Sequence, residues 1–208
     1  MFYLIKMPRW LTRIYHNCIW QIKTDEKILY LSFDDGPHPV ATNFVLDTLK
    51  QFDAKATFFC IGNNVAAHTE LYNLIIEKGH AIGNHTYDHL NGWTTKNNIY
   101  FKNIEQAQNL IKSTLFRPPF GKITFKQINY LLAKKPNFKI IMWSVLSADF
   151  DKNITKEKCL KNVLKNTTKG SIIVFHDSEK AFENLRYALP KFMEYYARLG
   201  YRFEKIES

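Results

Sequence analysis

The chain has 208 residues, of which 46% are hydrophobic, 15% aromatic and 23% charged. This length and apolar content predict one folded domain with its own core, and they exclude a disordered or collagen-like chain. Lys and Arg number 29 against 19 Asp and Glu, a net charge of +10. Such a balance favours anionic partners, but the basic residues are scattered, which indicates a lysine-rich surface rather than a nucleic-acid-binding stripe.

Residues 1–27 are interpreted as a basic N-terminal extension that packs on a domain formed by residues 28–208. Lys6, Arg9 and Arg13 interrupt its apolar residues, so no hydrophobic stretch of signal-peptide length is left. The chain also lacks the run of about 20 apolar residues that a membrane-spanning helix needs. We therefore expect a cytoplasmic or peripherally membrane-associated protein. Contact of this basic, aromatic segment with a membrane surface or a cell-wall polymer is an alternative to simple packing.

From residue 28 onward, seven short apolar segments are rich in Ile, Val, Phe and Tyr, as strands tend to be. Several are apolar throughout, which is typical of strands that are buried on both faces in a parallel sheet. The predicted strands are residues 28–33, 56–61, 80–85, 115–117, 139–146, 171–175 and 201–205.

Segments with apolar residues at helical spacing separate these strands. They lie around residues 45–52, 71–75, 100–111, 128–132, 160–164 and 185–199. Thr155 is a predicted N-cap, and Pro190 is expected to kink the last helix or divide it in two. The alternation predicts an α/β fold with parallel strands, either an incomplete barrel or an open doubly wound sheet. Functional groups are expected at the carboxyl ends of the strands in both cases.

Two adjacent carboxylates, Asp34 and Asp35, follow the first predicted strand directly. Charged groups at the end of a buried strand are costly unless they have partners. Gly36 and Pro37 force a turn there, and this turn can aim the two side chains differently.

The third predicted strand ends near His85 and His89, which are four residues apart. On a helical turn they would share one face and could bind one metal ion. Two His and one Asp make three ligands and leave a position open, as in catalytic zinc sites. The second carboxylate could then act as a general base.

Two further strand ends carry polar residues. Arg117 begins an Arg-Pro-Pro-Phe segment, in which a rigid backbone can present amide groups while the Arg holds a carboxylate. His176 ends the strand at 171–175, and beside a metal site it is a candidate general acid.

In combination, order and spacing, these motifs resemble those of the polysaccharide deacetylases, the NodB-like carbohydrate esterases of family 4. The resemblance covers residues 28–206. Residues 32–37 match the family's first motif, which implies that Asp34 is the general base and Asp35 a metal ligand. Residues 85–89 match the second motif, which implies that His85 and His89 complete the ligand set.

The third and fifth motifs of the family are also matched. The match at residues 117–120 implies that Arg117 orients the base and that the backbone N–H of Phe120 stabilises the oxyanion. The match at residues 174–176 implies that Val174 lines the acetyl pocket and that His176 is the general acid.

The fourth motif departs from the family pattern. Asp149 keeps the acidic position that tunes the catalytic His, but Leu146 and Phe150 stand where the family often has Asp and Trp. The metal ligands, the base and the acid are all present, so we expect the core chemistry to survive. The substrate groove, to which Leu146 and Phe150 are assigned, is expected to be less well described by the family.

The resemblance implies a distorted, incomplete (β/α)7 barrel that uses one divalent metal ion, zinc before cobalt or nickel. The implied activity removes acetyl groups from an N-acetylated sugar or polysaccharide, peptidoglycan-like or chitin-like, and yields acetate and a free amine. Hydrolysis of another N-acyl substrate and a catalytically inactive sugar-binding relative are the alternatives. Nucleic acid is not an expected partner.

Overall fold

The computed structural model of the chain describes residues 3–207. Its parallel strands form one sheet in the order β1-β6-β5-β4-β3-β2-β8-β7, and β9 pairs with the start of β2. The strands are β1 (Cys18–Ile19), β2 (Ile28–Asp34), β3 (Thr57–Cys60), β4 (Ala81–Asn84), β5 (Leu115–Phe116), β6 (Lys139–Ile141), β7 (Val145–Leu146), β8 (Ile172–His176) and β9 (Arg202–Phe203).

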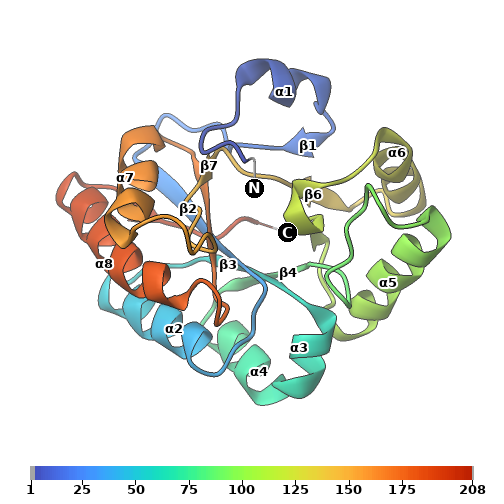
Figure 1. The fold of residues 1–208 in the computed structure, drawn as a ribbon, viewed down its shortest axis with the longest axis horizontal. Helices are drawn as coiled ribbons and strands as arrows, with labels where there is room; N and C mark the ends of the chain where they lie inside the picture. Colours follow the sequence, from blue (N-terminus) through green and yellow to red (C-terminus); the bar gives the residue numbers. More distant parts are fainter. Residues whose placement is uncertain (1–2, 208) are drawn as a thin grey trace.

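The helices surround this curled sheet (Figure 1). Most of them follow a strand and return the chain to the amino end of the next one, as parallel strands require. The helices are α1 (Arg9–Ile14), α2 (Ala41–Gln51), α3 (Gly62–Ala67), α4 (Thr69–Glu77), α5 (Asn97–Leu110), α6 (Phe125–Lys134), α7 (Lys156–Asn166) and α8 (Phe182–Arg198), with the short 3₁₀ helix η1 (Pro119–Gly121). The predicted barrel-like α/β fold with parallel strands is confirmed.

The barrel is incomplete because no ladder joins β6 to β7 within residues 3–207. The N-terminal segment lies across this opening. Its strand β1 pairs with β6, whereas Lys6 forms an antiparallel bridge with Val145 of β7. The Met7 N–H donates to the Ser144 carbonyl at 3.0 Å, and the Leu146 N–H donates to the Ile5 carbonyl at 2.8 Å. The segment before β2 therefore contacts the strands on both sides of the opening, β6 and β7.

The prediction of one strand over residues 139–146 is wrong. The chain forms β6 beside β5, leaves the sheet, and forms β7 beside β8 on the other side of the opening. The carbonyls of Ile141 and Met142 accept hydrogen bonds from the buried Arg117 guanidinium, at 3.2 and 3.1 Å. These carbonyls accept hydrogen bonds from a buried cation, and the β5–β6 ladder ends there.

Two helical features also differ from the prediction or refine it. Helix α8 runs through Pro190 without dividing, since the structure has one helix from Phe182 to Arg198. Thr155 caps α7 as predicted, because its side chain accepts a hydrogen bond from the Lys158 N–H at 3.2 Å. Strand β1 and helices α1 and α3 were not predicted.

The apolar residues of β2, β3 and β8 form the centre of the core with α2, α7 and α8. Cys18, Cys60 and Cys159 are buried and free. Among residues 3–207, no helix is both long enough and apolar enough to cross a membrane.

Candidate active site

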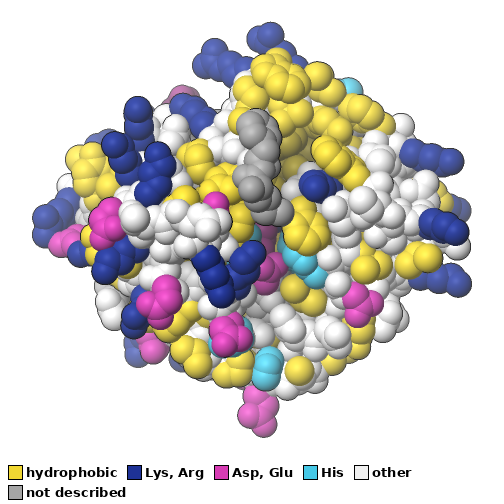
Figure 2. All heavy atoms as spheres, viewed as in Figure 1, with side chains coloured by type: hydrophobic (Ala, Val, Ile, Leu, Met, Phe, Trp, Pro, Cys, Tyr) yellow, Lys and Arg dark blue, Asp and Glu magenta, His cyan; other side chains and the backbone are white. Residues whose placement is uncertain are grey.

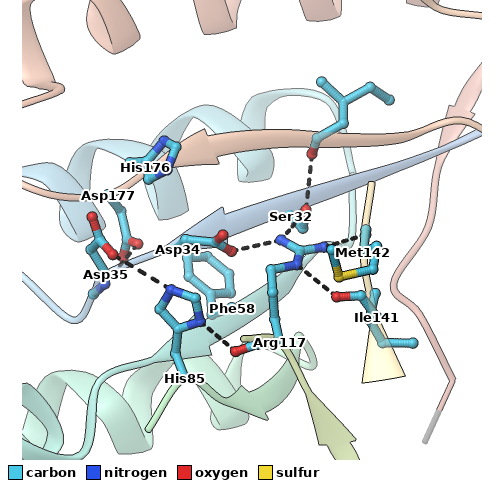
Figure 3. Close-up of polar contacts among 12 residues, drawn as sticks. Ser32, Asp34, Asp35, Phe58, His85, Arg117, Ile141, Met142, His176 and Asp177 are labelled. Atoms are coloured by element: carbon cyan, nitrogen blue, oxygen red, sulfur yellow. Dashed lines mark hydrogen bonds and ion pairs between the residues drawn. The ribbon is translucent and has the colours of Figure 1, made fainter. Parts of the chain in front are cut away.

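The carboxyl ends of β2, β4, β5, β7 and β8 meet around one cavity of about 520 Å³. Parallel strands in a curled sheet bring these ends together although they are far apart in sequence. The cavity brings together the sequence-predicted residues Asp34, Asp35, His85, His89, Phe120, Leu146, Phe150, Val174 and His176. Arg117 and Asp149 are not part of this lining. Arg117 contacts Asp34 (Figure 3), and Asp149 contacts His176.

Asp35, His85 and His89 form a cluster whose potential ligand atoms all lie within 4.8 Å of one another. The Asp35 Oδ1 atom is 3.2 Å from Nε2 of His89 and 3.7 Å from Nε2 of His85. Among residues 3–207, no other group of three or more His, Cys, Asp or Glu has this geometry.

The expectation that His85 and His89 lie on a helical turn is wrong. Residues 85–89 form a loop in which Thr86 and His89 have left-handed backbone, with φ of 65° and 56°. Asn103 holds this loop, since its Oδ1 accepts the N–H groups of Tyr87 and Asp88 at 2.9 and 3.0 Å. The loop still brings both imidazoles close to Asp35, although it has no helical turn.

The donor set fits a divalent cation. Asp35 Oδ1 is buried and accepts no hydrogen bond from residues 3–207, which is unfavourable for a carboxylate unless a cation takes that place. The Nδ1 atom of His85 is 2.8 Å from the Arg117 carbonyl, which leaves Nε2 unprotonated and directed toward Asp35 (Figure 3). Two imidazoles and one carboxylate form a ligand set that zinc accepts.

The electrostatics of the cluster agree with this assignment. Burial lowers the pKa of His85 to about 4, so its imidazole is neutral near pH 7. Burial alone would raise the pKa of Asp35, but His89, His176 and His85 outweigh it and leave that pKa below the ordinary value. A neutral imidazole and an ionised carboxylate are the forms that bind metal ions.

We expect His85→Ala to lower the metal content of the purified protein from about one divalent ion per chain toward zero. The change removes one of three ligands. His16→Ala, which removes an exposed imidazole outside the cluster, is the matched control and should leave the metal content unchanged. Elemental analysis by mass spectrometry measures both, and equal occupancy in the two variants would contradict the ligand assignment.

Asp34 is turned away from the cluster by a different set of partners. Arg117, which is fully buried, donates from Nη1 to Asp34 Oδ1 at 2.6 Å and to Ser32 Oγ at 2.8 Å. The guanidinium also lies over the Phe59 ring, 4.0 Å from its centre. One oxygen of Asp34 is thus held in a fixed position while the residue lines the cavity.

His176 and Asp149 form a second polar pair at the cavity. The His176 Nδ1–H donates to Asp149 Oδ1 at 2.7 Å, and the His176 backbone N–H donates to Oδ2 at 2.8 Å. Burial opposes a charge on His176, but Asp149 outweighs it and raises the pKa of His176 to about 9. The imidazole is therefore protonated at neutral pH, with its Nε2 edge left for the cavity.

The remaining predicted residues shape the walls of the cavity. Phe120 has left-handed backbone (φ 60°), and its ring packs 4.5 Å from the His89 ring. Phe150 packs edge-on against His176 with ring centres 5.0 Å apart. Leu146 and Val174 are buried neighbours in the β7–β8 ladder. Leu146 and Phe150, the two residues that depart from the family's fourth motif, both line this cavity.

Sequence reasoning missed Asp177. Its Oδ1 accepts the Gly36 N–H at 3.1 Å, and its Oδ2 accepts the Thr42 hydroxyl at 2.5 Å. A Cβ atom on Gly36 would lie 2.0 Å from Asp177 Oδ2, so only glycine fits there. Asp177 thus supports the turn that carries Asp34 and Asp35. The sequence signal that could have identified Asp177 was its position directly after His176 at a strand end.

Tyr3 was also missed, and no motif could have identified it. Its ring packs edge-on against Phe150 at 5.4 Å, and its hydroxyl donates to Asp151 Oδ2 at 2.6 Å. Tyr3 thereby lines the catalytic cavity from the N-terminal segment.

Residues 21–135 match the sequence model of the family described as "Polysaccharide deacetylase". The chain belongs to this family. Over 193 residues it is 33% identical to a peptidoglycan-N-acetylglucosamine deacetylase of Bacillus cereus, with 90% of each chain covered. It is 31% identical over 164 residues to the peptidoglycan-N-acetylmuramic acid deacetylase PdaC of Bacillus subtilis, which covers 75% of this chain but only 33% of PdaC.

A solved structure agrees with this membership of the polysaccharide deacetylase family. It is a crystal structure of a peptidoglycan N-acetylglucosamine deacetylase in complex with 4-naphthalen-1-yl-N-oxidanyl-benzamide. The TM-score is 0.86 at 29% identity, with 96% of this chain and 95% of that chain covered. The fold of this family member is therefore the fold of the deacetylase domain.

Proposed function

We propose that the protein is a metal-dependent hydrolase that removes acetyl groups from an N-acetylated glycan. The observation that supports it most is that the Asp35, His85 and His89 cluster shares one cavity with two polar pairs. These pairs are Asp34 with Arg117 and His176 with Asp149. A base, an acid and an open metal site together are what amide hydrolysis needs.

Asp35, His85 and His89 would hold the metal ion, zinc before cobalt or nickel. When bound, a divalent cation supplies Lewis acidity to water and to an acyl carbonyl at this site. Because only three protein ligands surround the position, it is left open toward the cavity. The backbone N–H of Phe120 is the proposed donor to the oxyanion that develops on the acyl oxygen.

Asp34 is the proposed general base. Arg117 occupies its Oδ1, so the other oxygen is left to accept a proton from the attacking water. The buried guanidinium also fixes the orientation of the carboxylate. Arg117 is thus a positioning residue that acts through Asp34.

His176 is the proposed general acid. It lies on the strand next to that of Asp34, in register with it, and lines the same cavity. Asp149 takes its Nδ1–H and supports the positive charge, so the proton on Nε2 can be donated to the leaving amine. Val174, Leu146 and Phe150 would enclose the acetyl group and the adjoining sugar ring.

The proposed acid predicts a pH dependence. A pKa of about 9 means that His176 is protonated below that pH, so kcat should fall as the pH rises through about 9. Asp149→Asn removes the charge that raises this pKa, and we expect the fall to move to lower pH. Stopped assays of acetate release across pH 6–10 measure it. If kcat of Asp149→Asn still fell at the same high pH, this would contradict the proposed role of the His176–Asp149 pair.

Acetate release from a panel of chitin oligomers, peptidoglycan and small N-acyl sugars tests the proposed function directly. We expect release from at least one N-acetylated glycan, dependent on added divalent metal. N-formyl sugars in the panel test the alternative N-acyl substrate. Binding of a glycan with no release from any substrate would support the inactive relative instead. The panel also identifies which sugar is the substrate, since the relatives are named for N-acetylglucosamine and for N-acetylmuramic acid units.

A further inference from the structure

A second cavity, of about 320 Å³, adjoins the catalytic cavity. The two cavities share part of their walls, because six residues line both. The shared residues are Tyr3, Phe120, Gly121, Lys122, Trp143 and Leu146. A molecule whose reacting group lies at the metal cluster can therefore extend past Leu146 into this second cavity.

The far wall of the second cavity is the N-terminal segment. Leu4, Met7, Leu11, Tyr15 and Trp20 line it from that side. Figure 2 shows hydrophobic side chains gathered over α1. The lining contains one charged side chain, Lys122, whose ammonium group lies over the Trp93 ring, 5.4 Å from its centre.

The apolar wall is held in place by specific contacts. Tyr15 stacks on Phe125 with ring centres 4.5 Å apart, and its carbonyl accepts the Trp20 indole N–H at 3.1 Å. Met7 is fixed by the backbone hydrogen bond from its N–H to the carbonyl of Ser144. These contacts pre-form the cavity, and pre-formed apolar pockets bind apolar groups without an ordering cost.

We propose that this cavity, the apolar subsite, binds a hydrocarbon or aryl group attached to the amino sugar. The substrate class is then an amphiphilic N-acetylated amino sugar, and the assignment rests on the proposed deacetylation. A further sugar ring is disfavoured because its hydroxyl groups need several polar partners, and the Tyr3, Trp20 and Trp93 donors of the lining are already bonded within the chain. Apolar surface that leaves water there stabilises the complex.

Methyl and octyl N-acetyl-β-D-glucosaminide are the probes, the octyl compound below its critical micelle concentration. Both carry the same sugar and the same scissile acetyl group. Calorimetry of the metal-loaded protein measures binding, and acetate release measures hydrolysis. We expect the octyl glycoside to bind at least about tenfold more tightly, since each buried methylene contributes about a factor of four. Its KM should fall accordingly.

Two variants on one helix localise the effect. Leu11→Asp puts a charge into the wall of the apolar subsite and should abolish the octyl preference while leaving methyl glycoside hydrolysis unchanged. Ile14→Asp, on the exposed side of α1 and outside the lining, should keep the preference. Trp93→Ser, at a 59% exposed rim residue that lines only this subsite, is a second variant in case Leu11→Asp fails to fold. Thermal unfolding checks each protein.

The outcomes separate this inference from the proposed function. Octyl-selective binding without acetate release would overturn the deacetylase function and leave the subsite standing. Acetate release with equal binding of the two glycosides would overturn the subsite. Self-association that Leu11→Asp abolishes, with no octyl preference, would also overturn it and assign the cavity to a second copy of the chain.

Discussion

Asp34→Asn is expected to lower kcat by about 10²- to 10⁴-fold and to leave the metal content unchanged. The asparagine amide keeps the size of the side chain and an oxygen for Arg117 but accepts no proton at neutral pH. Asp34 is also outside the cluster of Asp35, His85 and His89, so the ligands are intact. Acetate release and elemental analysis on the same preparation measure the two quantities.

Asp35→Asn is the matched comparison at the neighbouring position. It removes the negative charge from an oxygen that lies 3.2 and 3.7 Å from the two imidazoles. We expect metal loss, with activity that partly returns as the metal concentration is raised. Added metal should not restore Asp34→Asn. Equal metal loss in the two variants would contradict the division of roles between the adjacent carboxylates.

Folding of Asp34→Asn needs its own control. Arg117 is fully buried and would lose its anionic partner, and an unpaired buried charge costs about 3–5 kcal/mol. Arg117 keeps its bonds to Ser32 and to the carbonyls of Ile141 and Met142, which reduces this cost. Circular dichroism and thermal unfolding distinguish a folded inactive protein from an unfolded one.

His176→Ala is expected to lower kcat on an N-acetyl sugar by about 10²- to 10⁴-fold, with normal metal content. An amine is a poor leaving group unless it is protonated, and His176 is the half-buried, protonated imidazole at the cavity. The loss should appear in kcat more than in KM, because the proton is transferred in the transition state.

A substrate that needs no acid provides the control for His176. The 4-nitrophenolate of 4-nitrophenyl acetate leaves without a proton, so His176→Ala should reduce this hydrolysis far less than that of the N-acetyl sugar. A similar loss on both substrates would mean that His176 supports the structure of the cavity instead. Near-normal activity on the sugar would remove it from the mechanism altogether.

Much of the active site could be predicted from local sequence. Asp34, His85, Arg117 and His176 each follow a short apolar segment that is buried in the structure, and parallel strands bring such positions to one end of the sheet. This rule holds even where the local conformation was predicted wrongly. The loop after β4 is not helical, yet the strand end still delivers both imidazoles to Asp35.

Contacts between distant segments could not be predicted in this way. The division of residues 139–146 follows from Arg117, a side chain from another strand end, which takes two carbonyls of that segment. The support of the Asp34–Asp35 turn by Asp177 depends on the parallel register of β2 and β8. The first interaction produces no pattern within its own stretch of sequence, and for the second the sequence shows only that Asp177 follows His176 at a strand end.

The amino-acid sequence by itself determined the class of fold and the family, and it predicted the catalytic side chains, because strand periodicity and strand-end motifs are local features of the chain. Only the tertiary structure decided what the N-terminal segment does. That segment contacts both edges of the open barrel, supplies Tyr3 to the catalytic cavity and walls the apolar subsite. Its partners lie more than a hundred residues away, and such pairings are set by packing of the whole chain rather than by local pattern.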